Sequence, residues 1–118
     1  MSEHDEVRVA GAATLDRGDA KVFEAGGKPD GGFVVGTGEG VVAYQNACPH
    51  IGFDLDMGTA EFYVAKLDRL YCRVHGATFE IETGLCDRGP CSGQSLVRLR
   101  SRVDGDDVVV DVPAMLNA

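Results

Sequence analysis

Two short stretches, Cys48-Pro49-His50 and Cys72-Arg73-Val74-His75, decide what this chain folds around. They are separated by 21 residues, and each supplies one thiol and one imidazole, spaced C-x-H in the first and C-x-x-H in the second. Thiolates bind zinc or the iron of iron–sulfur clusters, and imidazole binds zinc or iron. Four such ligands in two pairs predict a metal centre held between two loops.

The candidate ligands are the cysteines and histidines of these two stretches, namely Cys48, His50, Cys72 and His75. They fit a 2Fe-2S cluster in which both cysteines bind one iron and both histidines bind the other. Two thiolates neutralise the formal charge of the oxidised core, so reduction leaves this site less negative than an all-cysteine site, and the potential is higher. A zinc site built from the same side chains is the alternative.

The stretch from Gln45 to Leu96 resembles small bacterial Rieske proteins. The matching residues are Cys48, Pro49, His50, Leu55, Cys72, His75, Gly76, Phe79, Gly84, Gly89, Pro90 and Leu96. The two motifs together, followed by H-G-x-x-F and G-P, are much more specific than either motif alone. The connection Phe53–Arg69 is longer than in the commonest members of the family, which predicts an enlarged loop or hairpin.

Two departures from the Rieske proteins of cytochrome bc complexes bear on the reduction potential. Those proteins brace the cluster loops with a disulfide, whereas the matching positions here are Phe53 and Val74. They also use a serine and a tyrosine hydroxyl to hydrogen-bond the sulfurs, where this chain has Ala77 and Phe79. Because such hydrogen bonds stabilise the reduced cluster, their absence predicts a potential on the order of −150 to 0 mV, at the low end of the Rieske range.

Length and composition predict a single domain, residues 1–118, with a modest core. The acidic N-terminus has no apolar run behind it, so we expect neither a signal peptide nor a transmembrane segment, and the cytoplasm is the expected compartment. The formal net charge of −8 argues against nucleic acid and anionic membranes as partners. It suits a carrier that docks on basic patches, or it simply keeps a small protein in solution.

The two remaining cysteines, Cys86 and Cys91, leave three interpretations open. They are reduced, half-buried side chains, or they form a disulfide across Gly89-Pro90, or they are ligands. The last interpretation needs a different type of cluster.

Short apolar or alternating runs between glycine and aspartate turns predict an all-β protein. The expected strands are Val7–Ala10, Ala20–Glu24, Phe33–Thr37, Val41–Asn46, Leu70–Tyr71, Thr78–Glu82, Leu96–Arg102 and Val108–Val112. Turns are expected at Gly36–Gly40, Asp104–Asp106 and Glu82–Gly84. The segment Ala60–Leu67 is ambiguous between a short helix and an extended arm.

The resemblance implies the Rieske fold. In that fold an antiparallel β sandwich or barrel is formed here by residues 1–45 and 95–118, and residues 46–94 form a smaller cluster-binding subdomain inserted into it.

The resemblance also implies a function: a soluble, monomeric one-electron carrier that uses a Rieske 2Fe-2S cluster. Such a carrier takes electrons from a flavin-dependent reductase and passes them to a terminal oxygenase. The alternatives are a small Rieske subunit of a reductase complex, as in assimilatory nitrite reductase, and a zinc or redox-sensing interaction module. No catalytic residue is expected, because a mononuclear iron site needs about two histidines and a carboxylate and only His4 remains.

Overall fold

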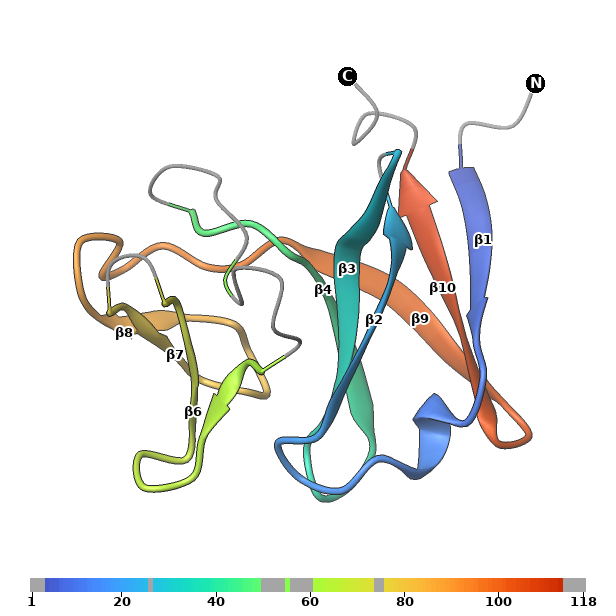
Figure 1. The fold of residues 1–118 in the computed structure, drawn as a ribbon, viewed down its shortest axis with the longest axis horizontal. Helices are drawn as coiled ribbons and strands as arrows, with labels where there is room; N and C mark the ends of the chain where they lie inside the picture. Colours follow the sequence, from blue (N-terminus) through green and yellow to red (C-terminus); the bar gives the residue numbers. More distant parts are fainter. Residues whose placement is uncertain (1–3, 26, 50–54, 56–60, 74–75, 114–118) are drawn as a thin grey trace.

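The computed structural model describes residues 4–25, 27–49, 55, 61–73 and 76–113, which form two antiparallel sheets and one short 3-10 helix (Figure 1). The strands are β1 (His4–Val9), β2 (Ala20–Ala25), β3 (Lys28–Gly36), β4 (Val41–Gln45), β5 (Tyr63–Val64), β6 (Arg69–Tyr71), β7 (Thr78–Phe79), β8 (Cys86–Arg88), β9 (Arg98–Asp104) and β10 (Asp107–Pro113). The helix, η1, spans Ala12–Thr14. The predicted all-β class is confirmed.

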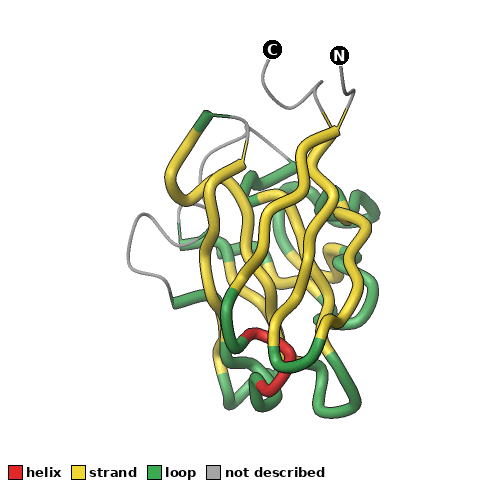
Figure 2. The backbone as a smooth tube through the Cα atoms, turned by 90° about the vertical axis from the view of Figure 1, so that its right-hand side faces the viewer, coloured by secondary structure: helices red, strands yellow, loops and turns green. Residues whose placement is uncertain are grey.

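The larger sheet has six strands in the order β1-β10-β9-β4-β3-β2 and curls into a nearly closed barrel. The smaller sheet has four strands in the order β5-β6-β7-β8 and lies beside the barrel (Figure 1). Figure 2 shows η1 at the end of the barrel opposite the chain termini. The strands of the smaller sheet fall between Tyr63 and Arg88, inside the range 46–94 for which a subdomain is predicted; that division stays a prediction.

Strands β3 and β4 form a wall between two hydrophobic cores. Phe33, Val34 and Val35 are consecutive and all fully buried. Phe33 and Val35 pack into the core shared with the small sheet, whereas Val34 points into the barrel. Successive side chains of a strand face opposite sides of the sheet, so a strand buried on both faces has a continuous apolar run.

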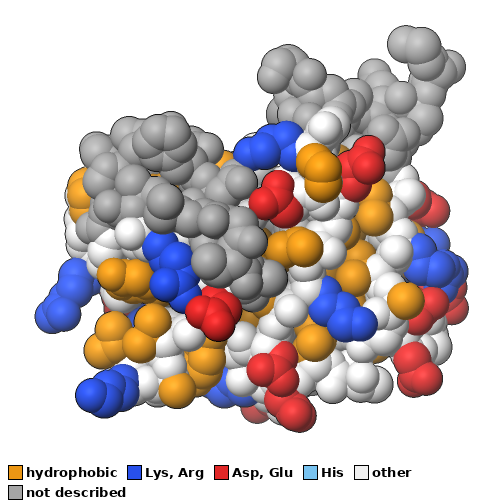
Figure 3. Space-filling model, in the orientation of Figure 1, with side chains coloured by type: hydrophobic (Ala, Val, Ile, Leu, Met, Phe, Trp, Pro, Cys, Tyr) orange, Lys and Arg blue, Asp and Glu red, His pale blue; other side chains and the backbone are white. Residues whose placement is uncertain are grey.

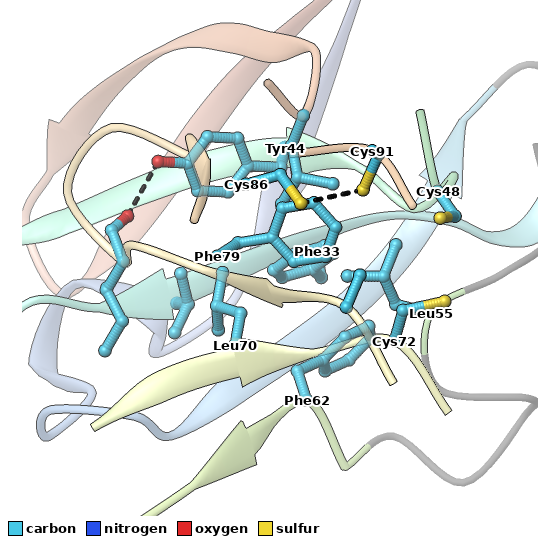
Figure 4. Close-up of a cluster of buried hydrophobic side chains, with 14 of the residues drawn as sticks. Phe33, Tyr44, Cys48, Leu55, Phe62, Leu70, Cys72, Phe79, Cys86 and Cys91 are labelled. Carbon is cyan, nitrogen blue, oxygen red and sulfur yellow. Dashed lines mark hydrogen bonds between the residues drawn. The ribbon is translucent and has the colours of Figure 1, made fainter. Parts of the chain in front are cut away.

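Aromatic side chains hold the small sheet and its loops against this wall. The Phe33 ring stacks on Phe62, with centroids 4.1 Å apart and an interplanar angle of 16°. The buried Tyr44 hydroxyl donates a 2.6 Å hydrogen bond to the Ile81 carbonyl in the turn after β7 (Figure 4). Burial raises the pKa of Tyr44 to about 12, which keeps the hydroxyl protonated as a donor.

Arg17, in the loop before β2, ties the barrel to two turns of the small sheet. Its Nε and Nη2 bind both carboxylate oxygens of Asp68 at 2.8 and 2.9 Å, in the turn between β5 and β6. Its Nη1 binds Glu82 at 2.6 Å and also the Thr37 carbonyl. Hydrogen bonds from Arg17 first, and then from Tyr63, lower the pKa of Asp68 to about 2.

Most expected strands are present, but the one expected at Phe33–Thr37 begins at Lys28 in the structure, five residues earlier. The added stretch contains Pro29 and two glycines, which are uncommon inside strands. The register accommodates the proline, because β4 pairs with β3 only from Gly32 onward. The missing N–H of Pro29 therefore leaves no β4 partner unsatisfied.

The small sheet deviates more from the expected pattern. The strand expected at Thr78–Glu82 ends at Phe79, after which the chain turns and buries Ile81. The described part of Ala60–Leu67, residues 61–67, contains β5 and a turn, so it is extended and not helical. Strand β8 was not expected, because a three-residue strand is too short to show alternation. The three expected turns are confirmed.

Replacing Arg17 tests the connection between the two sheets. Arg17→Ala removes the paired donors of Asp68 and Glu82 together, and we expect a clear fall in the midpoint of thermal unfolding. The matched control is Arg102→Ala, which removes a single exposed ion pair with Glu6 and is expected to have almost no effect. Equal midpoints for the two variants would contradict this role of Arg17.

The loss of stability caused by Arg17→Ala should depend on pH in a direction set by the pKa of Asp68. The pKa of Asp68 is depressed in the folded protein, so its stabilising contribution is complete above the unfolded pKa of about 3.9 and is lost as pH falls toward 2. The difference in unfolding midpoint between the wild type and Arg17→Ala is expected to be the same at pH 7 and pH 5 and smaller at pH 3. A difference that already shrinks between pH 7 and pH 5 would contradict the assignment.

Candidate metal centre

The two candidate cysteine ligands are buried at the ends of neighbouring structural elements. Cys48 follows β4 and is 1% exposed, and Cys72 follows β6 and is 0% exposed. Both belong to the core shared by the barrel wall and the small sheet, and Leu55 packs in the same core (Figure 4). The other two candidates, His50 and His75, lie outside the described residues, as do Phe53 and Val74.

Asn46 anchors the loop that carries the first motif. Its side chain is 2% exposed and follows the last residue of β4. Its Oδ1 accepts a 2.8 Å hydrogen bond from the Leu55 N–H, and its Nδ2 donates a 3.0 Å bond to the Asp30 carbonyl. One amide group thus joins Leu55 to Asp30 of β3, which helps to hold the loop of Cys48 against that strand.

The loop that carries the second motif is closed by its own backbone. Cys72 N–H donates to the Ala77 carbonyl and Gly76 N–H donates to the Cys72 carbonyl, each at 2.8 Å. Gly76 has a φ of 73°, a conformation that favours glycine. Arg73 N–H donates to the Leu55 carbonyl at 2.9 Å, so Leu55 connects the second loop to the first.

The glycine–proline loop packs closely against Ala77, two residues after the second motif. A Cβ on Gly89, which has a φ of 112°, would lie 2.8 Å from Ala77 Cα and 2.9 Å from Ala77 Cβ. Only glycine fits this approach without a shift of the backbone. Ala77 and Phe79 are fully buried and bring no hydroxyl to the site, and the nearby Thr78 hydroxyl donates to Asp87 at 2.6 Å.

Charged groups close to the motifs form local pairs. Arg73, between two of the candidate ligands, pairs with Glu61 at 2.7 Å. Asp87 accepts from Thr78 and from Arg69, and these two hydrogen bonds, in that order, lower the pKa of Asp87. An exposed pair such as Arg73–Glu61 contributes little to stability.

The donor set fits an iron–sulfur group. Cys48 and Cys72 are soft ligands, they are shielded from water, and their loops are joined through Leu55. Among the described residues, no group of three or more histidine, cysteine, aspartate or glutamate side chains is arranged to hold a metal ion. The described part of the site is therefore a pair of thiols on two connected loops.

Comparison with known proteins decides the family. The family model of the Rieske [2Fe-2S] domain matches residues 5–112 of this chain. The chain belongs to the Rieske [2Fe-2S] domain family. The resemblance inferred from the two motifs is confirmed, and so is the expected cofactor, a Rieske-type 2Fe-2S cluster. One-electron transfer is the chemistry that this cluster supplies, and the Rieske domain here is an electron carrier and not a catalytic enzyme.

Several solved structures share the fold. The ferredoxin of carbazole 1,9a-dioxygenase from Nocardioides aromaticivorans IC177 is 30% identical, with a TM-score of 0.67, and the match covers 92% of this chain and 97% of that one. A ferredoxin of Sphingomonas yanoikuyae B1 is 21% identical, with a TM-score of 0.69 and coverage of 92% and 100%. No curated protein matches the chain. The described residues include no helix with the length and apolar character to cross a membrane.

Asn46 was missed by the sequence reasoning, although a polar residue at the end of the apolar run Val41–Tyr44 is a signal that could have been used. Asn46→Ala leaves the buried Leu55 N–H without its acceptor, and we expect a loss of about 1–3 kcal/mol in the free energy of unfolding. The variant should also lose iron faster to a chelator, because the first loop is no longer anchored.

The matched control is Gln45→Ala, which shortens the neighbouring, half-buried amide side chain. Chemical denaturation and iron release followed by visible absorbance measure the two effects. Wild-type iron release in Asn46→Ala would show that Asn46 stabilises the fold without positioning the cluster loop.

Proposed function

We propose that this protein is a monomeric one-electron carrier that works in the cytoplasm between a flavin-dependent reductase and a terminal oxygenase. The cluster ligands in this proposal are Cys48, His50, Cys72 and His75. The observation that carries the proposal is the burial of Cys48 and Cys72 on two connected loops of a Rieske domain.

The similar solved structures support an oxygenase as the acceptor. Of the solved structures described above, the one with the higher sequence identity to this chain, 30%, is a ferredoxin of carbazole 1,9a-dioxygenase. Another match, at 24% identity and a TM-score of 0.66, comes from a complex of reduced oxygenase and oxidised ferredoxin in carbazole 1,9a-dioxygenase. That complex shows that the same fold binds a terminal oxygenase, and we extend this class of partner to the present chain.

The residues of this chain would contribute a dry and nearly apolar environment. Cys48 and Cys72 supply thiolates from the core, and Ala77 and Phe79, buried in the same core, offer hydrocarbon in place of hydroxyl donors. Fewer hydrogen bonds to the sulfurs favour the oxidised form of the cluster, which is consistent with a reduction potential on the order of −150 to 0 mV. A low potential of this kind suits a carrier that donates electrons to an oxygenase.

Charge supports transient docking. The net charge is −8, and on the face shown in Figure 3 acidic and basic side chains are interspersed, without one sign covering that face. The net negative charge attracts a basic partner over a long range, and salt should weaken this attraction.

The ligand assignment is tested on the histidine of the second motif. His75→Ala removes one of the two imidazoles, and we expect the rhombic Rieske-type electron paramagnetic resonance signal of the dithionite-reduced protein to disappear. The core of the barrel is formed by side chains of the barrel strands and η1, so the far-ultraviolet circular dichroism should keep its β signature.

His4→Ala is the control, because His4 is the histidine outside both motifs and its replacement should leave the signal unchanged. A full Rieske signal in His75→Ala would show that the ligand set is wrong. A wild-type sample that contains zinc and no acid-labile sulfide would overturn the electron-carrier proposal.

Mixing experiments distinguish a diffusing electron carrier from a subunit that stays bound in a reductase complex. As a carrier, the protein should elute as a monomer in gel filtration with a purified ring-hydroxylating oxygenase at moderate salt. The reduced protein should transfer electrons to the oxygenase with a rate constant that falls about tenfold between low and high ionic strength. A stoichiometric complex that survives high salt would favour the reductase-subunit alternative.

A further inference from the structure

Cys86 and Cys91 form a close thiol pair that the proposed ligand set does not use. Each side chain is 1% exposed, and the two sulfurs are 2.9 Å apart, with Cys91 donating to Cys86 (Figure 4). A disulfide bond is about 2.05 Å long, so less than about 1 Å of movement separates the thiol pair from covalent bonding distance.

The backbone around the pair keeps the two cysteines together. Cys86 N–H donates to the Gln94 carbonyl at 2.7 Å, and Gly93 N–H donates back to the Cys86 carbonyl at 3.0 Å. Gln94 N–H donates to the Cys91 carbonyl at 2.8 Å. These bonds close residues 86–94 into a compact loop whose tip, residues 87–90 and 92–93, is exposed to solvent.

Two hydrogen bonds of the pair stay within this loop. The Cys91 thiol donates to Cys86, and the Cys86 thiol donates to the Arg88 carbonyl at 3.3 Å. Cys91 also lies beside Cys48, one of the candidate cluster ligands, in the same core. The four cysteines therefore divide into two candidate ligands and one pair whose sulfurs face each other.

We propose that Cys86 and Cys91 are a reversible redox-modification site, which forms an intramolecular disulfide behind Cys48 while the cluster stays in place. The oxidant is a low-molecular-weight disulfide. One cysteine thiolate attacks it and releases a small thiolate, and the second cysteine then displaces the other half of the reagent. In total two S–H bonds are lost, one S–S bond forms, and the reagent is reduced to two thiols.

The reaction needs only local opening of the loop. The residues that flank the two buried cysteines, 87–90 and 92–93, are exposed, and exposed segments of this kind open more easily than the core of a sheet. Disulfides in the cytosol are usually transient and redox-sensing, so a reversible pair is in keeping with the proposed compartment.

The test uses the cluster-containing protein, purified without oxygen and equilibrated in mixtures of reduced and oxidised glutathione. Samples are quenched in acidic urea, alkylated with N-ethylmaleimide and weighed by mass spectrometry, while visible absorbance before the quench reports the cluster. Of the four cysteines, we expect four labels in reducing mixtures and two in oxidising mixtures. Peptide mapping should link Cys86 to Cys91, and excess reduced glutathione should restore four labels.

Cys86→Ser and Cys91→Ser are the matched controls. Each should keep the cluster absorbance and take three labels in reducing mixtures. In oxidising mixtures the single remaining cysteine can lose its label only to one bound glutathione, with no link between two cysteines of the protein. Full labelling of Cys48 and Cys72 in these variants also shows that iron released in the quench does not oxidise them. Four labels on the wild type in every mixture would overturn the proposal, and so would a link that includes Cys48 or Cys72.

Loss of the cluster in either serine variant would also overturn the proposal, because Cys86 and Cys91 would then be needed to hold the cluster and could not be a separate disulfide pair. The His75→Ala experiment decides the ligand set independently. Failure of the disulfide and failure of the electron-carrier function are therefore distinguishable.

Discussion

The hydrogen bonds that meet at Leu55 are the constraint on which the metal centre depends. The buried Asn46 side chain accepts from its N–H, and the second motif donates to its carbonyl through Arg73. The two ligand loops are thus joined by one residue that follows the first motif closely in the sequence. Because a cluster needs ligands from both loops at once, their relative position has to be built into the polypeptide before electrons are transferred.

The double-faced wall of β3 and β4 extends this constraint to the whole molecule. One face closes the barrel, and the other face carries Phe33 and Tyr44, which contact Phe62 and the turn at Ile81. Arg17 then joins two turns of the small sheet to the barrel through its ion pairs with Asp68 and Glu82. Apolar packing near the motifs and charged hydrogen bonds away from them hold the small sheet at two separate places.

The four cysteines show how similar side chains can acquire different roles. All four are buried in the same core, where hydrophobicity alone does not distinguish them. Cys48 and Cys72 lie on loops that are connected through Leu55, whereas Cys86 and Cys91 face each other across a single loop. Backbone geometry therefore separates a candidate ligand pair from a candidate disulfide pair, and motif spacing identified only the first.

The sequence by itself determined the family, the cofactor, the all-β class and most of the strands in the barrel. These features depend on local patterns: the spacing of Cys and His in two motifs, the apolar runs, and glycine or aspartate at turns. Only the tertiary structure showed the early start of β3 at Lys28, the anchoring by Asn46, the bridging by Arg17 and the contact of Cys86 with Cys91. The first three depend on residues distant in the chain or on the register of a neighbouring strand. The contact of Cys86 with Cys91 spans five residues, and the sequence left it open because spacing alone does not decide how the loop between them folds. No local pattern encodes which distant backbone group will lie opposite a side chain, because that is decided by how the two sheets pack.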